Sequence, residues 1–168
     1  MGEWKPSMEG LVVDQHFWKD RSVLITGHTG FKGGWLSLWL HLLGAKVYGY
    51  SREPNTMPNF FEVTNLSSIF EKSYIGDINN LDLLYKTFQE TKPSIIFHLA
   101  AQPLVRDSYA NPIETFQTNC MGTVNIFEVS RKVNGIQGII NITSDKCYDN
   151  KEWIWPYREE DRLGGIDP

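Results

Sequence analysis

The chain has 168 residues, of which 41% are hydrophobic and 21% are charged, a composition typical of a globular domain with a packed core and not of a disordered chain. Because 16 lysines and arginines stand against 20 aspartates and glutamates, with no basic run, the composition argues against nucleic acid as a partner. The longest apolar segment, Trp35 to Leu43, is far too short to span a bilayer, so we expect no membrane association.

Residues 1–16 predict an N-terminal lead-in, with the first dozen loosely held, and residues 17–168 predict one domain. The lead-in has acidic residues and no apolar signal core, so we expect no export signal and a cytoplasmic protein. In that compartment Cys120 and Cys147 are expected to stay reduced. The 4 histidines and 2 cysteines form no cluster with the spacing of metal ligands, so we expect no metal site.

A strand, a glycine-rich turn and a helix are predicted over residues 22–43. The β-branched and aliphatic run 22–26 leads into a GxxGxxG spacing, one residue longer than the commoner GxGxxG, and an unbroken apolar segment follows. Such a turn leaves the strand sharply, lets the backbone approach a pyrophosphate and presents the amino end of the helix to the anion. We expect this turn to bind a dinucleotide through Gly27, Thr29, Gly30, Phe31, Lys32 and Gly33.

Four more strands are predicted to alternate with helices. The expected strands are 46–50, 72–75, 94–98 and 138–143. The expected helices are a short one near 65–70, one capped by Asn80, and one over 112–132 with Ile113, Phe116, Thr123, Ile126 and Phe127 near one face. This alternation predicts an α/β fold, a Rossmann-like, doubly wound parallel sheet in the order 3-2-1-4-5.

The strand ends carry further candidate cofactor residues. Arg52 follows the second strand, where an arginine favours the 2′-phosphate of NADP and an acidic residue the ribose hydroxyl of NAD; Arg52 could also be a surface charge or lie on the adenine. Asp77, after the third strand, could bind the adenine amino group or be a turn residue. After the fourth strand, small residues run where the backbone passes a cofactor, and His98 is favoured as a packed histidine over a base.

The fifth strand leads into Thr143-Ser144-Asp145-Lys146 at the carboxyl edge, where open α/β sheets bind ligands. A hydroxyl, a carboxylate and an amine in succession could supply a hydrogen-bond donor, a general acid and a base. The amine serves as a base only where its surroundings lower its pKa. An ordinary Asp-Lys turn is the alternative.

Segments 26–33, 98–106, 118–123 and 143–146 together resemble the extended short-chain dehydrogenase/reductase family of nucleotide-sugar enzymes. Within that family the chain is most similar to the CDP-glucose 4,6-dehydratases, from about residue 17 onward, on the segments 28–33, 102–106 and 144–146. The resemblance implies NAD, a nucleotide sugar such as CDP-glucose as substrate, and a homodimer that pairs through helices such as 112–132. It also implies Arg106 as a substrate contact and completes the cofactor-binding set with Arg52, Asp77, Ile78, Leu99, Ala100, Ala101, Gln102 and Thr118.

The reaction implied by this resemblance is oxidation of the sugar at C4, elimination of water across C5 and C6, and return of the hydride to C6. Ser144 would hydrogen-bond the C4 oxygen, Asp145 would protonate the leaving C6 hydroxyl, and Lys146 would stand where related dehydratases place a glutamate base. The implied NAD conflicts with the simple rule for Arg52.

The family's catalytic Tyr-x-x-x-Lys pair is absent from the chain, because neither Tyr148 nor Tyr157 has a lysine four residues later. We therefore expect a fragment that lacks the last strands and the C-terminal sugar-nucleotide domain and is inactive alone. Two alternatives stay open. One is a nucleotide-sugar 4-epimerase or reductase, which the acid and base at 145 and 146 disfavour. The other is a non-catalytic dinucleotide-binding module, which the uncovered sheet edge disfavours.

Overall fold

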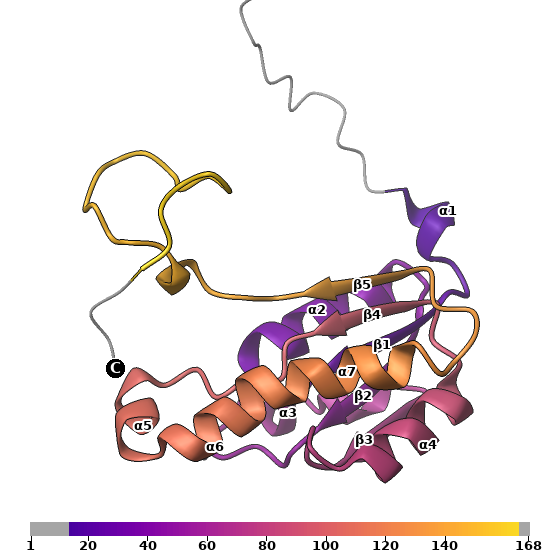
Figure 1. Cartoon of the computed structure of the whole chain (residues 1–168). Helices are drawn as coiled ribbons and strands as arrows, with labels where there is room; N and C mark the ends of the chain where they lie inside the picture. The colour runs from indigo at the N-terminus through magenta and orange to yellow at the C-terminus, as the bar shows by residue number, and fades with distance from the viewer. Residues whose placement is uncertain (1–13, 165–168) are drawn as a thin grey trace, which may run out of the picture.

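The computed structural model describes residues 14–164, which fold around a five-stranded parallel sheet (Figure 1). The strand order β3-β2-β1-β4-β5 confirms the predicted topology. In register, Thr26 lies beside Tyr50 on one side and beside His98 on the other, so the ends of three strands meet at one edge. The strands are β1 (Ser22–Thr26), β2 (Lys46–Ser51), β3 (Lys72–Ile75), β4 (Ile95–His98) and β5 (Gly138–Asn141).

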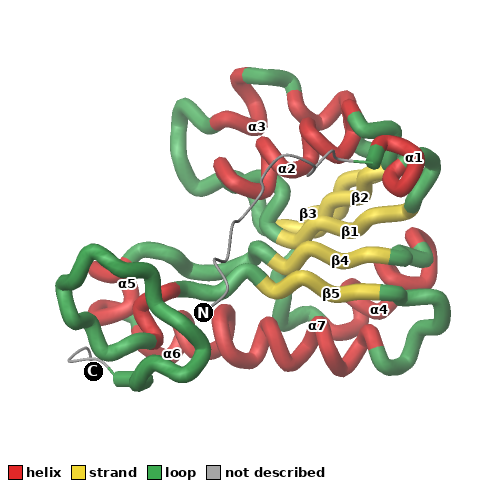
Figure 2. The backbone as a smooth tube through the Cα atoms, turned by 90° about the horizontal axis from the view of Figure 1, so that it is seen from above, coloured by secondary structure: helices red, strands yellow, loops and turns green. Residues whose placement is uncertain are grey.

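Helices cover the two faces of the sheet in separate layers (Figure 2). On one face lie α1 (Gln15–Trp18), α2 (Phe31–Leu42) and α3 (Phe60–Val63), with the 3₁₀ helix η1 (Leu66–Ile69). On the other face lie α4 (Leu81–Thr91) and α7 (Gly122–Ser130). The short helices α5 (Val105–Ala110) and α6 (Pro112–Phe116) lie beyond the carboxyl ends of β4 and β5.

Each face of the sheet buries its own apolar cluster. The β1 residues Val23 and Ile25 pack with Leu40 on the α2 side, and the intervening Leu24 packs with Phe88 and Ile126 on the side of α4 and α7. The alternation follows from the two-residue period of a strand, and burial on both faces explains why β1 is apolar throughout.

Local signals begin and end the helices largely as predicted. The Asn80 side chain accepts a hydrogen bond from the backbone N–H of Leu83, which caps α4 as expected. Gly44 follows the end of α2 with φ of 86° and donates its N–H to the His41 carbonyl, so the chain turns there into β2. Phe17 packs edge-to-face on Trp18, which covers Phe97 of the sheet.

The helical region expected over 112–132 is one interrupted helix. The π-helical turn η2 (Gln117–Met121) joins α6 to α7, and the helix ends at Ser130. A π-helical turn inserts an extra residue, so one 3.6-residue period does not describe both halves. Of the residues expected on one face, Ile126 is fully buried, whereas Ile113 and Phe116 before the π-helical turn are exposed, and so is Phe127, the neighbour of Ile126 on α7.

Other boundaries differ modestly from expectation. The strands β4 and β5 are shorter than predicted, starting at Ile95 and ending at Asn141. The short helix expected near 65–70 is the 3₁₀ helix η1, whereas α3, α5 and η3 (Asp145–Cys147) were not predicted, because elements this short carry little periodicity. The helix α1 begins inside the expected lead-in, and the expectation for the first dozen residues lies outside the described part of the chain.

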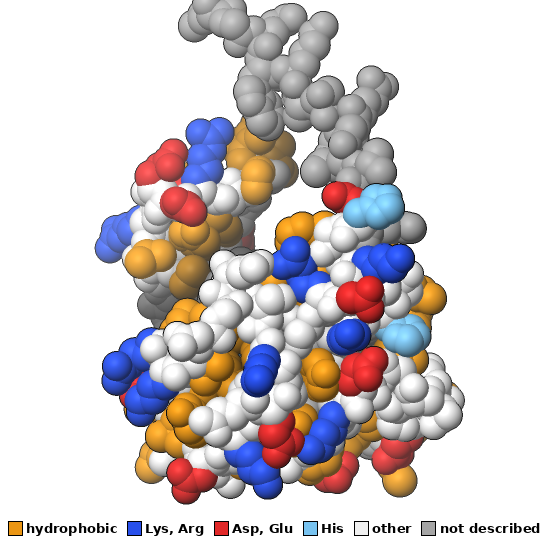
Figure 3. All heavy atoms as spheres, turned by 90° about the vertical axis from the view of Figure 1, so that its right-hand side faces the viewer, with side chains coloured by type: hydrophobic (Ala, Val, Ile, Leu, Met, Phe, Trp, Pro, Cys, Tyr) orange, Lys and Arg blue, Asp and Glu red, His pale blue; other side chains and the backbone are white. Residues whose placement is uncertain are grey.

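Between residues 14 and 164, no helix is long and apolar enough to cross a membrane. Cys120 and Cys147 are free thiols, and both are exposed. Figure 3 shows lysine and arginine side chains interspersed with aspartate and glutamate over the face that it presents.

Candidate functional site

The turn between β1 and α2 has glycine at two positions where a side chain would not fit. Gly27 has φ of 76°, which favours glycine, and a Cβ there would stand 2.8 Å from the carbonyl carbon of Leu99. A Cβ on Gly33 would stand 2.2 Å from the carbonyl oxygen of Gly27. These two glycines therefore let the end of β1, the start of α2 and the backbone after β4 pack closely together at the turn.

The amino end of α2 lies at this turn without a side-chain cap. Its N-cap residue is Gly30, which has no side chain to accept a hydrogen bond from the first turn. The first N–H groups of a helix have no intrahelical partner, and the helix dipole favours negative charge beside them. The predicted Phe31 and Lys32 are the first two residues of this helix, and both are exposed. This end of α2 is suited to a phosphate group.

The Thr29 side chain joins the glycine turn to the end of β2. Its hydroxyl donates to the Arg52 carbonyl at 3.0 Å and lies 2.8 Å from the Ser51 hydroxyl, which therefore donates to it. Thr29 is buried, whereas the Arg52 side chain extends outward and makes an ion pair with Glu114 of α6 at 3.0 Å. The predicted positions Thr29 and Arg52 are thus brought together, with the backbone of Arg52 held and its guanidinium partnered.

A buried chain of hydrogen bonds fixes the ends of β1 and β4. The backbone N–H groups of Leu99 and Ala100 donate to Thr26 Oγ1, so the Thr26 hydroxyl hydrogen points to His98 Nδ1 at 2.6 Å. His98 then carries its proton on Nε2, which faces the Thr123 hydroxyl at 3.3 Å. Burial lowers the pKa of His98 to about 4. This agrees with the expected packed histidine and not with a base.

The loop after β4 is hydrogen-bonded to the π-helical turn through the side chain of Asn119. The Asn119 side chain accepts from the Gln102 backbone N–H at 2.7 Å and donates to the Gln102 carbonyl at 3.0 Å. The Gln102 side chain donates to the Thr115 hydroxyl, which connects the same loop to α6. Thr118 lies half-buried in the same π-helical turn, and such turns are frequent at functional sites. The predicted residues Leu99, Ala100, Ala101 and Gln102 thus run along the carboxyl edge beside Thr118.

Asp77 and Ile78 follow β3 at the same edge. One Asp77 carboxylate oxygen accepts from the backbone N–H and the side-chain amide of Asn79, so Asp77 makes the turn that was its alternative assignment. Tyr50 donates its hydroxyl to the Asp77 carbonyl. Ile78 is buried, and a Cβ on Gly122 of α7 would stand 2.6 Å from its Cγ2.

Ser144 and Lys146 lie exposed beyond β5, where the chain leaves the sheet (Figure 1). The Ser144 hydroxyl accepts from the Lys146 backbone N–H at 3.2 Å, and Asp145 opens η3 between them. Arg106 is exposed on α5. The roles predicted for Ser144, Asp145, Lys146 and Arg106 stay predictions.

His28 is a residue of the turn for which sequence reasoning assigned no role. Its ring is fully buried against Phe61 and Phe70, and Nε2 lies 2.7 Å from the Ser73 hydroxyl. A Cβ on Gly49 would stand 2.4 Å from this ring, so the imidazole fills the space that Gly49 leaves on β2. Burial lowers the pKa of His28 to about 4. The sequence signal that could have indicated this packing role was the histidine of the His-Thr-Gly segment in the turn, together with a glycine, Gly49, inside a strand.

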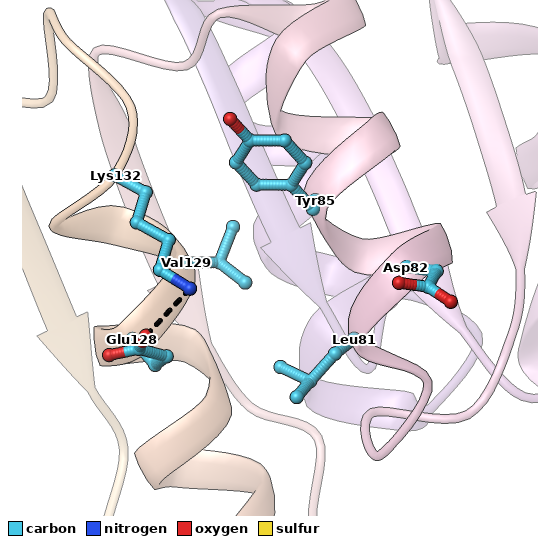
Figure 4. Close-up of a pocket in the computed structure, with 6 residues that line it drawn as sticks. All are labelled: Leu81, Asp82, Tyr85, Glu128, Val129 and Lys132. Atoms are coloured by element: carbon cyan, nitrogen blue, oxygen red, sulfur yellow. Dashed lines mark ion pairs between the residues drawn. The ribbon is translucent and has the colours of Figure 1, made fainter.

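A shallow pocket of about 390 Å³ lies on the helical layer between α4 and α7 (Figure 4). Its α4 side is lined by Leu81, Asp82 and Tyr85. Its other side is lined by Glu128 and Val129 of α7 and by Lys132 after the end of that helix, and Lys132 makes an ion pair with Glu128. The pocket is formed by the outer sides of two helices and not by the glycine turn or the strand ends. Among the described residues, no group of three or more histidine, cysteine, aspartate or glutamate side chains is placed to hold a metal ion.

The model of the family described as GDP-mannose 4,6 dehydratase matches residues 24–168, which include the glycine turn and the segment after β5. The chain belongs to this family. The match confirms the resemblance to nucleotide-sugar enzymes that the motifs indicated.

Relatives with known activities include dehydratases and epimerases. A CDP-glucose 4,6-dehydratase of Salmonella typhimurium is 53% identical over 157 residues, covering 94% of this chain and 44% of that protein. UDP-glucuronate 4-epimerase 1 of Arabidopsis thaliana is 33% identical, covering 84% of this chain and 33% of that protein. The chain thus spans less than half the length of these relatives.

The fold is shared with solved structures of the same class. The UDP-glucose 4-epimerase of Bifidobacterium longum, solved in complex with NAD⁺ and UDP, matches with a TM-score of 0.72 and 27% identity, covering 85% of this chain and 42% of that one. The match confirms the predicted Rossmann-like fold.

Proposed function

We propose that this chain holds NAD across the carboxyl edge of its sheet as part of a nucleotide-sugar 4,6-dehydratase. The observation that carries the cofactor proposal is the bare glycine turn. Gly33 leaves no room for a Cβ beside the Gly27 carbonyl, and the uncapped amino end of α2 begins at Gly30. Such a turn accepts a pyrophosphate. A homologous epimerase was solved with NAD⁺ bound, which supports the assignment.

The proposed pyrophosphate contacts are Gly27, Gly30 and the backbone of Phe31, Lys32 and Gly33. Thr29 holds the turn to β2. The adenosine end would lie toward Arg52, Asp77 and Ile78. The nicotinamide end would lie toward the backbone after β4 and toward Thr118, because these residues line the same edge beyond β1 and β4.

The proposed substrate is CDP-glucose, on the strength of the 53% identity to a CDP-glucose 4,6-dehydratase. A bound NAD would supply the redox chemistry, hydride uptake from C4 of the sugar and its return to C6, so no external reductant would be consumed. A ketone at C4 makes the C5 proton acidic, so that elimination of the C6 hydroxyl follows. Arg106 is proposed to contact the nucleotide sugar.

The segment after β5 is proposed to supply the groups for elimination. Ser144 would donate a hydrogen bond to the C4 oxygen, Asp145 would protonate the leaving hydroxyl, and Lys146 would take the C5 proton. Both Ser144 and Lys146 are exposed at the carboxyl edge, so a substrate can reach them. The initial deprotonation at the C4 hydroxyl belongs to the family's Tyr-x-x-x-Lys pair, which this chain does not contain.

The test is incubation of the full-length gene product, and of this 168-residue chain beside it, with NAD and CDP-glucose deuterated at C4. The proposal predicts that the full-length protein forms a 4-keto-6-deoxy sugar with the deuterium at C6, visible by NMR. A Lys146→Ala variant should lose elimination while retaining NAD binding. A product with inverted C4 and an intact C6 hydroxyl would instead assign an epimerase, and no reaction with any nucleotide hexose would refute both.

A homodimer is proposed to form through the outer face of α4, α6 and α7. Exposed apolar side chains lie on all three helices, and those of α4 line the pocket of Figure 4. They are Leu81, Tyr85, Ile113, Phe116, Val124 and Phe127. A surface of this kind, rimmed by the charges of Glu128 and Lys132, is typical of a protein–protein interface.

A further inference from the structure

The end of β2 combines two features that point to different cofactors. Arg52 follows the strand where an arginine ordinarily favours the 2′-phosphate of NADP, whereas the first acidic residue after the strand, Glu53, comes one position later and is exposed. The Arg52 guanidinium, however, donates to the carboxylate of Glu114 at 3.0 Å. Glu114 lies 62 positions away in sequence, on α6.

We propose that Glu114 is the residue that selects NAD over NADP at this site. It does so by neutralising Arg52 and by placing a carboxylate beside any phosphate that Arg52 could bind. The inference rests on the proposed function, because it takes the glycine turn to be a dinucleotide site.

The backbone of Arg52 is fixed, which leaves its side chain as the variable part. Thr29 of the glycine turn donates to the Arg52 carbonyl at 3.0 Å and accepts from Ser51. These hydrogen bonds connect the glycine turn to the end of β2. The guanidinium consequently projects from a set point beside the turn.

The opposing carboxylate is also held at the site edge. Glu114 stands in the first turn of α6, and its neighbour Thr115 accepts from the side chain of Gln102 after β4. The ion pair thus joins the end of β2 to the helix that borders the β4 loop. It links the two sides of the edge at which the site lies.

Charge decides the selectivity. Within the pair the charges of Arg52 and Glu114 cancel, so a neutral ribose hydroxyl is tolerated. A 2′-phosphate would carry nearly two negative charges into contact distance of the Glu114 carboxylate. Both side chains are more than half exposed, at 62% and 55%, so solvent screens this repulsion in part and added salt weakens it.

The experiment is a calorimetric titration of NAD and of NADP into the 168-residue chain and its Glu114→Gln variant. Glutamine keeps an acceptor for Arg52 and removes the charge. We expect NADP to bind the variant about tenfold more tightly relative to NAD, with the change shrinking at high salt. Adding Arg52→Ala to Glu114→Gln should abolish the gain, because the phosphate then has no cation to bind.

Glu90→Gln is the matched control. Glu90 also forms an exposed ion pair, with Lys72, but Lys72 begins β3 at the amino edge of the sheet. This variant should leave the NAD-to-NADP ratio unchanged. If the wild-type chain binds NAD and Glu114→Gln leaves the ratio of NAD to NADP affinity unchanged, the role of Glu114 is overturned while the proposed cofactor site stands. Failure of the wild-type chain to bind either dinucleotide overturns the proposed cofactor site and this inference with it.

Discussion

Gly33 of α2 faces the Gly27 carbonyl so closely that a Cβ at position 33 would stand 2.2 Å from the oxygen. Real Cβ atoms do not approach backbone oxygen to that distance, and neither partner is a flexible side chain that could move aside. The contact therefore links the first turn of α2 to the end of β1. It gives a physical reason for the third glycine of the motif.

Replacement of Gly33 by alanine is expected to reduce stability and dinucleotide binding together, because the turn must open to admit the methyl group. We expect a loss of about 1–3 kcal/mol in the free energy of unfolding, measured by urea denaturation. Gly138→Ala is the control, since a Cβ at Gly138 would meet nothing within 4 Å. Equal stability of the two variants would contradict the packing account.

Removal of the Asn119 amide is expected to release the loop after β4. Asn119→Ala deletes both hydrogen bonds to Gln102, and the half-buried backbone groups lose their partner. We expect a cost of about 2–3 kcal/mol in urea denaturation. Asn134→Ala, in an exposed loop residue after α7, should cost less than about 0.5 kcal/mol. Equal free energies of unfolding for the two variants, within error, would show that the hydrogen bonds between Asn119 and Gln102 do not contribute to stability.

Two buried histidines are expected to make stability depend on pH. Burial lowers the pKa of both His28 and His98 to about 4, against about 6.5 in the unfolded chain. The unfolded state therefore binds more protons below pH 6.5, so stability is complete above that pH and is lost as pH falls toward 4. The limiting slope is about 2.7 kcal/mol per pH unit for two such groups.

The measurement is urea denaturation between pH 5 and 7.5, where exposed carboxylates stay ionised. His98→Gln should roughly halve the slope, whereas the same change at the exposed His41 should leave it intact. A flat profile for the unmodified chain would mean that neither histidine has its pKa lowered by folding, and half the slope would mean that only one has.

Charge on the outer face of α7 is expected to dissociate the proposed homodimer. Val124→Glu would introduce a carboxylate among the exposed apolar side chains of α6 and α7. Size-exclusion chromatography with light scattering should show a dimer for the unmodified chain and a monomer for this variant. The control is Val63→Glu, because Val63 is exposed on α3, on the opposite face of the sheet. A monomer before any change, or a dimer that tolerates glutamate at 124, would refute the interface.

The sheet could be predicted because strands and turns have local signals. The β-branched run before Gly27, the cap at Asn80 and the short apolar strands each carry their own evidence, and right-handed crossovers then limit the order. The exposure of Ile113 and Phe116 relative to Ile126 could not be predicted, because the π-helical turn between α6 and α7 shifts the period by one residue.

The candidate site, like the fold, could be predicted only in part. Gly27 and Gly33 could be identified from the sequence, because only glycine fits at these positions and the spacing of the glycines is visible in the sequence. The partner of Arg52 could not be, because Glu114 reaches it only through tertiary folding. His28 escaped assignment because a glycine inside a strand, Gly49, does not by itself indicate which side chain fills the space that it leaves.

The most direct test of the account is a calorimetric titration of NAD into the 168-residue chain, with folding checked by circular dichroism. The account predicts binding of one NAD per chain in the micromolar range, lost in Gly33→Ala and retained in Gly138→Ala. A chain that is folded by circular dichroism yet binds no NAD would contradict the assignment of the glycine turn as a dinucleotide site.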